Sequence, residues 1–98
     1  MSLLSAKEIA THLSSRPDWK IEGGELVRTF KFETFPDAVA FVDRIAELAE
    51  EAGHHPDIDI RYNHVRLALV SHDAGGLTGK DFALAAGADR LVDQLASV

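Results

Sequence analysis

Apolar residues recur along this chain with two different periods, which divide it into helices and strands. Within residues 34–53 the spacing is the i, i+3, i+4, i+7 pattern of an amphipathic helix, carried by Ala38, Phe41, Val42, Ile45, Leu48, Ala49 and Ala52. Two other stretches alternate with a period of two, which is typical of strands with one buried face. One surrounds Gly23-Gly24 and the other surrounds Asn63-His64. Each stretch therefore predicts a β-hairpin with its turn at those residues.

Capping signals predict where the first two helices begin and end. Ser5 followed by Glu8 forms a capping box, which opens a short helix that Pro17 stops. Thr34 is placed to cap the central helix, and Gly53 is placed to end it in the left-handed conformation.

A third helix closes the chain. Thr78 with Asp81 forms a second capping pair, and the inward positions that follow are Leu84, Ala88, Leu91, Val92 and Leu95. The order is then helix, two strands, helix, two strands, helix. Paired hairpins favour a four-stranded antiparallel sheet with the three helices packed on one face, an α+β fold. At 98 residues the chain has room for one domain, spanning 1–98.

The apolar stripe of the central helix is wider than one sheet face requires, because Val39 and Ala46 extend it. A deeply packed core helix explains the width, and so does a self-association surface, since small domains often gain stability by oligomerising. The pattern alone leaves both interpretations open.

Composition and charge exclude several classes of protein. The formal net charge is −6 and no basic stripe is present, so we expect neither nucleic-acid binding nor attraction to an anionic membrane. There is no cysteine, which removes disulfides, thiolate nucleophiles and zinc–thiolate sites. No apolar run approaches the ~20 residues of a membrane span, and the N-terminus lacks the features of a signal peptide. We expect a cytoplasmic protein.

The stretch "GHHPDIDIRYN" carries the first candidate chemistry. His54 and His55 follow the end of the central helix, and Pro56 stiffens the backbone after them. Imidazole titrates near pH 6.5, so each ring can donate or accept a proton, although a polar loop that happens to contain histidine fits the spacing equally. His72 ends the last strand and, if the hairpins pair as predicted, lies near both. Three histidines could bind zinc, but neither an i, i+4 histidine pair nor a convergent carboxylate supports a metal site.

Other polar residues have two interpretations each. Asp81 suits a capping role in the first helical turn, or it orients a histidine or a substrate nitrogen. Trp19 is the only tryptophan and is either a core residue or a flat wall beside a pocket. Ser71 has no acid partner beyond His72, so a hydrolase triad is weakly supported. Gly75-Gly76 lacks the pattern of a dinucleotide-binding loop.

In combination these residues resemble the pterin-4a-carbinolamine dehydratase family over nearly the whole chain. The matching segments are "PDWK", "HHPDIDIRYNHV" and "SHDAGGLTGKDFALA". The sequence departs from the family at Ile58, where animal members tend to carry tryptophan, and at Val70, where a small hydroxyl residue can occur. Both departures are expected to alter the rim of the pocket rather than the chemistry.

The resemblance implies dehydration of 4a-hydroxytetrahydropterin to quinonoid dihydropterin, which recycles the cofactor of aromatic amino-acid hydroxylases. It implies that His54, His55 and His72 line the pterin pocket as acid/base groups, with His55 the main proton donor and acceptor. Glu50 is implied to lie close to the site, and the substrate is expected to be bound by the three histidines with Ser71, Asp73, Asp81 and Trp19. Expelling water needs an acid and a base but no metal, redox cofactor or covalent nucleophile.

The family also implies partners. Its members are known as tetramers, so the resemblance implies a homodimer or homotetramer. Some members serve as a dimerisation cofactor of a transcription factor or as assembly factors. A non-catalytic binding, coactivator or assembly protein on the same scaffold is therefore the alternative function. All three histidines are present here, which favours the enzyme.

Overall fold

The computed structural model describes residues 2–96. The helices are α1 (Ala6–Ser14), α2 (Phe35–Ala52) and α3 (Gly79–Ala96), the short 3-10 helix is η1 (His72–Ala74), and the strands are β1 (Lys20–Glu22), β2 (Glu25–Lys31), β3 (Asp57–Arg61) and β4 (His64–Leu69). The predicted order α-β-β-α-β-β-α is confirmed, as is the α+β class.

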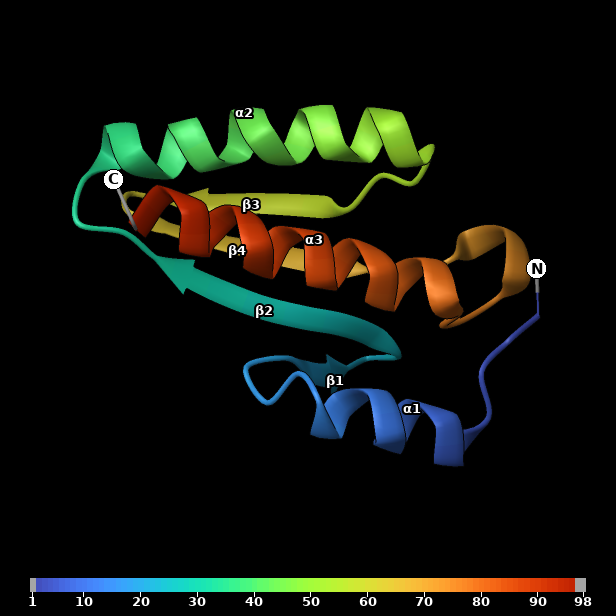
Figure 1. Cartoon of the computed structure of the whole chain (residues 1–98). Helices are drawn as coiled ribbons and strands as arrows, with labels where there is room; N and C mark the ends of the chain where they lie inside the picture. The colour runs from blue at the N-terminus through green and yellow to red at the C-terminus, as the bar shows by residue number, and fades with distance from the viewer. Residues whose placement is uncertain (1, 97–98) are drawn as a thin grey trace.

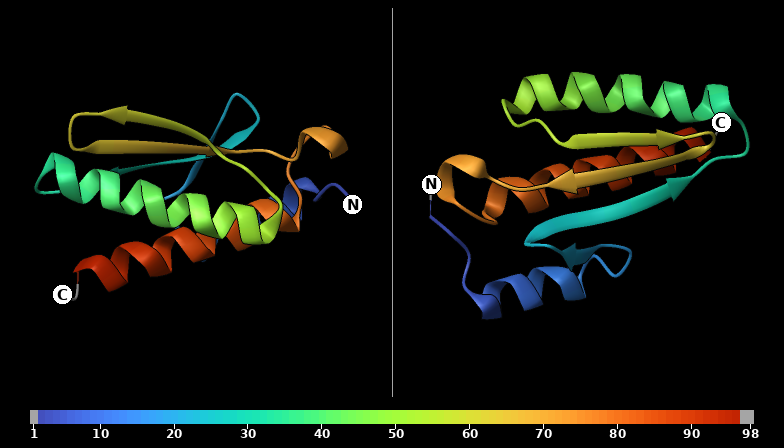
Figure 2. Two further views of the ribbon diagram at one scale, coloured as in Figure 1. Left: turned by 90° about the horizontal axis from the view of Figure 1, so that it is seen from above. Right: turned by 180° about the vertical axis from the view of Figure 1, so that it is seen from behind.

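The four strands form one antiparallel sheet in the order β1-β2-β4-β3. The two hairpins are thus joined through β2 and β4, whose register pairs Leu26 with Leu69 and Phe30 with Val65. Figure 1 shows α3 crossing in front of the sheet, with α2 beside β3 and α1 beside β1. Figure 2 shows α2 and α3 together beneath the sheet, and no helix of residues 2–96 covers the other face.

The core lies between the sheet and the helices. Its fully buried side chains include Leu26, Phe30, Phe41, Ile45, Val65, Leu67 and Leu69. Arg28 shares the inward face of β2, which interrupts the apolar pattern of that strand. Its guanidinium lies 4.2 Å from the ring centre of Phe30 and donates a 2.6 Å hydrogen bond to Asp89, so the charge is paired at the edge of the core.

The turn of the second hairpin lies one residue earlier than predicted. Arg61 pairs with His64, which leaves Tyr62 and Asn63 as a two-residue loop and makes His64 the first residue of β4. Tyr62 adopts φ 52°, the left-handed conformation that such a loop requires. Asn63 is buried and donates a side-chain hydrogen bond of 2.6 Å to the carbonyl of Phe32, which anchors the loop to the end of β2. His64 is exposed.

The predicted caps are present. Ser5 accepts from the Glu8 amide while the Glu8 side chain accepts from the Ser5 amide, which is the complete capping box. These bonds hold the pKa of Glu8 below its usual value. Thr34 accepts from the amide of Asp37, and Gly53 adopts φ 61°.

Helix α2 turns only part of its apolar stripe toward the core. Ala38, Phe41, Ile45 and Ala49 are buried, whereas Ala46 and Ala52 are exposed in the isolated chain. Packing against the sheet and α3 therefore does not use the whole width of the stripe. Within residues 2–96, no helix is long and apolar enough to cross a membrane.

Candidate active site

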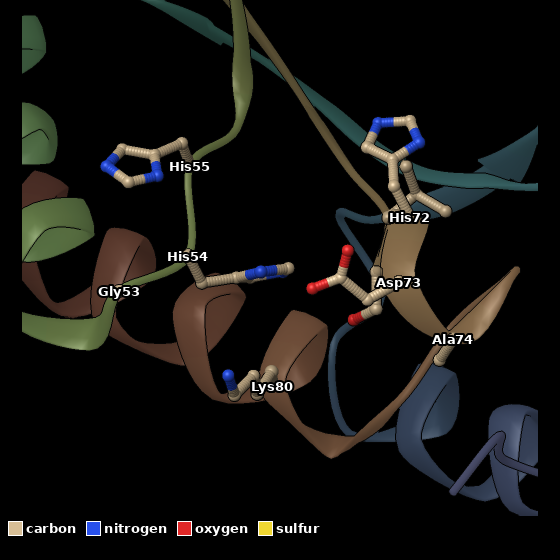
Figure 3. A pocket seen from close by; sticks show the side chains of 9 residues that line it. Gly53, His54, His55, His72, Asp73, Ala74 and Lys80 are labelled. Atoms are coloured by element: carbon tan, nitrogen blue, oxygen red, sulfur yellow. The ribbon is translucent and has the colours of Figure 1, made fainter. Parts of the chain in front are cut away.

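A cavity of about 430 Å³ lies where α2 ends, β4 ends and α3 begins. Its lining residues come from these junctions rather than from regular structure: Gly53, His54, His55, Val70, Ser71, His72, Asp73, Ala74 and Lys80. Because β3 and β4 are antiparallel neighbours, the start of β3 and the end of β4 fall at the same end of the sheet. The cavity therefore gathers His54, His55 and His72, and Figure 3 shows them on two facing segments.

The end of α2 sets the position of His54. The Gly53 amide donates to the carbonyl of Glu50, and the His54 amide donates to the carbonyl of Ala49 at 3.1 Å. These two bonds form a Schellman motif, which glycine permits because its backbone tolerates the positive φ. The backbone of His54 is thus part of the helix terminus.

A buried carboxylate orients the ring of His54. Its Nε2 lies 2.6 Å from Oδ1 of Asp81, and the two side chains are 11% and 0% exposed. An ionised carboxylate accepts hydrogen bonds and has no proton to donate. A neutral His54 therefore carries its proton on Nε2, which leaves Nδ1 as a proton acceptor.

Asp81 is fully satisfied by this arrangement. Its second oxygen accepts from the hydroxyl of Ser71 at 3.0 Å and from the amide of Thr78 at 2.9 Å. The hydroxyls of Ser71 and Thr78 are 2.8 Å apart, which closes a buried network. The capping role and the histidine-orienting role considered for Asp81 are therefore both present, one on each oxygen.

The other two histidines are held more loosely. His55 contacts the Glu50 carboxylate through Nε2, with the two side chains 63% and 75% exposed. Pairs this open to solvent are worth little in stability. His72 begins η1 and is exposed, and its ring has no hydrogen-bond or ion-pair partner among residues 2–96. The cavity thus contains one ring held by a buried carboxylate, one by an exposed carboxylate and one without a partner.

Not every predicted site residue reaches the cavity. Ser71 and Asp73 line it, and Asp81 lies directly behind His54. Trp19 is not among the lining residues: its buried indole donates to both oxygens of Asp89, at 2.9 and 3.1 Å. The indole therefore faces a second polar cluster, which leaves it unsuited to forming a wall of this cavity.

Sequence reasoning did not identify Lys80 as a residue of this site. It lines the cavity from the first turn of α3, next to Asp81. The available signal was its position directly before a candidate site residue at a predicted helix start. Val70 also lines the cavity, as expected of a rim position, whereas Ile58 does not.

The chemistry that this arrangement can perform is proton transfer. Several imidazoles approach one cavity from different directions, and two of them are oriented by carboxylates. Among the side chains of residues 2–96, no group of three or more His, Asp or Glu is placed to share a metal ion. The fold and the site thus define a small α+β protein with a histidine-lined pocket.

Comparison with known proteins shows which family this chain belongs to. Residues 2–91 match the family described as "Pterin 4 alpha carbinolamine dehydratase". A protein of Chloroflexus aurantiacus named "Putative pterin-4-alpha-carbinolamine dehydratase" is 64% identical over 94% of this chain and 99% of its own. A relative of the same name from Acidobacterium capsulatum is 58% identical over 94% of this chain and 100% of its own. The chain belongs to the pterin-4a-carbinolamine dehydratase family.

Two solved structures share the fold. The transcriptional coactivator/pterin dehydratase of Brucella melitensis superposes with a TM-score of 0.88 at 29% identity, covering 92% of this chain and 98% of that one. A pterin dehydratase-like protein identified as a RuBisCO assembly factor in the alpha-carboxysome gives 0.62 at 30% identity, covering 74% and 84%. The same scaffold is thus described with roles beyond dehydration.

Proposed function

We propose that this protein catalyses the dehydration of 4a-hydroxytetrahydropterin to quinonoid dihydropterin and water. The observation that carries the proposal is the convergence of His54, His55 and His72 on one cavity, in a chain of the dehydratase family. In the reaction the C4a–O bond breaks and the hydroxyl leaves as water after accepting a proton. A ring N–H gives up its proton, so one acid and one base suffice and no electrons are exchanged with another group.

The environments of the histidines suggest which ring transfers protons and which rings orient the substrate. We assign the main proton transfer to His55, because it is open to solvent protons and its Nε2 contacts Glu50. His54 is held by Asp81 and His72 has no partner within residues 2–96, so these two rings orient the pterin and its hydroxyl. General acid/base catalysis of this kind contributes about 10²- to 10⁴-fold to a rate.

The remaining parts of the proposal concern context. The product would be recycled to the tetrahydropterin used by aromatic amino-acid hydroxylases, in the cytoplasm. We propose a homodimer or homotetramer, supported by the exposed positions Ala46 and Ala52 on the apolar stripe of α2. Light scattering tests this, and a monomer of 10.7 kDa would contradict it.

A non-catalytic role is the second candidate. It is favoured by the two structural neighbours, one described as a transcriptional coactivator and the other as a RuBisCO assembly factor. In that case the fold would serve as a binding platform and the cavity would be dispensable for function.

An activity assay separates the two. The 4a-hydroxypterin is generated in situ by a phenylalanine hydroxylase, and its decay is followed with and without this protein. We expect acceleration over the spontaneous dehydration, unchanged by EDTA. His55→Ala should lower the rate by about 10²-fold or more, and His72→Ala should lower it as well. Neither variant should unfold the chain, because both side chains are exposed.

His64→Ala is the matched control, since this exposed histidine lies at the opposite end of β4 from the cavity. If the intact protein does not accelerate the dehydration, the proposed enzymatic function is refuted and the non-catalytic role is favoured. Normal rates in both cavity variants would place the site elsewhere, and loss of activity in EDTA that zinc restores would establish a metal enzyme.

A further inference from the structure

Lys80 introduces a permanent positive charge into the cavity that the proposed dehydration does not use. Its side chain lines the cavity, is exposed, and has no ion-pair or hydrogen-bond partner among residues 2–96. Most of the other polar groups at this helix start are already paired: the Thr78 amide with Asp81, and the Lys80 amide with the Thr78 hydroxyl at 3.3 Å. The ammonium group of Lys80 is thus available to a ligand.

Asp73 supplies the acidic side chain among the lining residues. It too has no partner among residues 2–96. Figure 3 shows the two charges on different elements, Asp73 beside His72 on η1 and Lys80 below His54 on α3. The cavity therefore has a negative group near one wall and a positive group near another, with histidines adjoining each.

A pterin has a matching polarity. Its pyrimidine edge presents an amino group and an adjacent ring N–H, two parallel donors that suit a carboxylate such as Asp73. Its C6 substituent lies at the other end of the bicycle, beyond the N5 and C4a atoms at which the dehydration takes place. A pterin bound with its pyrimidine edge on Asp73 directs C6 away from that wall, toward the side that carries Lys80.

We propose that Lys80 binds an anionic group, a carboxylate or a phosphate, on the C6 substituent, so that the substrates of this pocket are pterins with an acidic side chain. This inference rests on the proposed function, because it assumes that a pterin occupies the cavity. The surrounding charge makes this cation decisive for such a ligand: the chain carries −6, and Glu50 and Glu51 stand exposed at the end of α2 directly before the cavity. Those carboxylates would repel an acidic ligand unless a local cation compensated for them.

Binding of stable, oxidised pterins tests the inference without requiring turnover. The probes are 6-methylpterin, pterin-6-carboxylate and the phosphate monoester of 6-hydroxymethylpterin, titrated by their own fluorescence. We expect the intact protein to bind at least one anionic probe about two- to fivefold more tightly than 6-methylpterin. Lys80→Ala should abolish that preference and Lys80→Glu should reverse it, whereas Lys80→Arg should keep most of it.

Lys7→Ala is the matched control, because Lys7 is an exposed lysine on α1 that does not line the cavity. It should leave all three affinities unchanged. A preference for only one anionic probe identifies the acidic group, carboxylate or phosphate. The inference is overturned if the intact protein binds the probes equally, or if its preference survives in Lys80→Ala.

If the proposed dehydration itself is wrong, the binding and activity results differ from those just described. In that case no pterin binds at all, the neutral probe included, and the dehydration assay shows no acceleration. Equal binding of neutral and anionic probes by an active enzyme would reject the role of Lys80 alone.

Discussion

Helix α3 carries two carboxylates, and each is the centre of a hydrogen-bonded cluster with different partners. Asp81 lies in its first turn and Asp89 about two turns later. Asp81 is bound by the imidazole of His54 and by neutral donors from Ser71 and Thr78. Both residues draw together segments that are distant in sequence, but only one adjoins the cavity.

The partners of Asp89 are of another type. It accepts from the indole of Trp19, from Arg28 at 2.6 Å and from Arg16 at 3.2 Å. Its side chain is 16% exposed, and Arg28 also lies 3.7 Å from Asp18. Guanidinium groups stay charged at all ordinary pH values, so the arginine partners of Asp89 do not serve as acids or bases.

The comparison shows what separates a structural carboxylate from one that can take part in chemistry. The charge of Asp89 is neutralised by fixed cations that tie the α1–β1 connection and β2 to α3. Asp81 is paired with a ring that can gain or lose a proton, and that ring lines a cavity. Removing Asp89 should therefore affect stability, and altering Asp81 should affect the reaction.

The largest effect is expected from Asp89→Ala. It leaves two guanidinium groups and an indole N–H without their shared acceptor, which should lower the free energy of unfolding by about 3 kcal/mol. Urea unfolding followed by Trp19 fluorescence measures this. Asp43→Ala, at an exposed position on α2, is the control and should change little. Dehydratase activity per folded molecule should be retained; its loss would show that the two regions are coupled.

A smaller effect is expected from Asp81→Asn, and on the rate instead. The asparagine oxygen can still accept from Ser71 and the Thr78 amide, so the network largely survives. Its NH₂ group, however, would donate to Nε2 of His54 and invert the tautomer of that ring. We expect kcat to fall about tenfold to a hundredfold at nearly unchanged stability. An unchanged kcat would mean that Asp81 serves only as a cap.

The smallest effect is expected far from both clusters, at the exposed capping box of α1. Hydrogen bonds from Ser5 hold the pKa of Glu8 below its usual value of 4.5. The stabilisation is therefore complete above that value and is lost as the pH falls through the lowered pKa. Glu8→Ala removes the carboxylate that accepts from the Ser5 amide, so it should lower the melting temperature slightly at neutral pH, and the difference from the unchanged protein should shrink in acid. A difference that grows in acid would contradict this.

Much of the fold was predictable because its signals are local. The Ser5–Glu8 box, the Thr34 cap and the glycine after α2 each depend on residues close in sequence. The alternating runs predicted which residues face the core, but alternation says nothing of strand order, so the central position of β2 and β4 came only from the structure. The turn at Tyr62 was missed because a tyrosine in the left-handed conformation has no sequence signal.

The site was predictable only in part, because some of its contacts join residues that are distant in sequence. The histidines stand at element ends that the pattern identifies, and so does Asp81. The partner of Trp19 is not visible in this way, because Asp89 lies seventy positions along the chain and resembles any polar residue of an amphipathic helix. Whether a tryptophan faces a pocket or a carboxylate is decided by tertiary packing.

The Schellman motif at the end of α2 has a consequence for how the protein opens. Helix termini are the parts that fray first, at a small fraction of the cost of global unfolding. Because the His54 amide closes the last of those bonds, any fraying of this turn withdraws His54 from Asp81 and disrupts the pocket while the sheet stays folded. The pairing of His54 with Asp81 is thus expected to depend on the last turn of α2 rather than on the global stability of the fold.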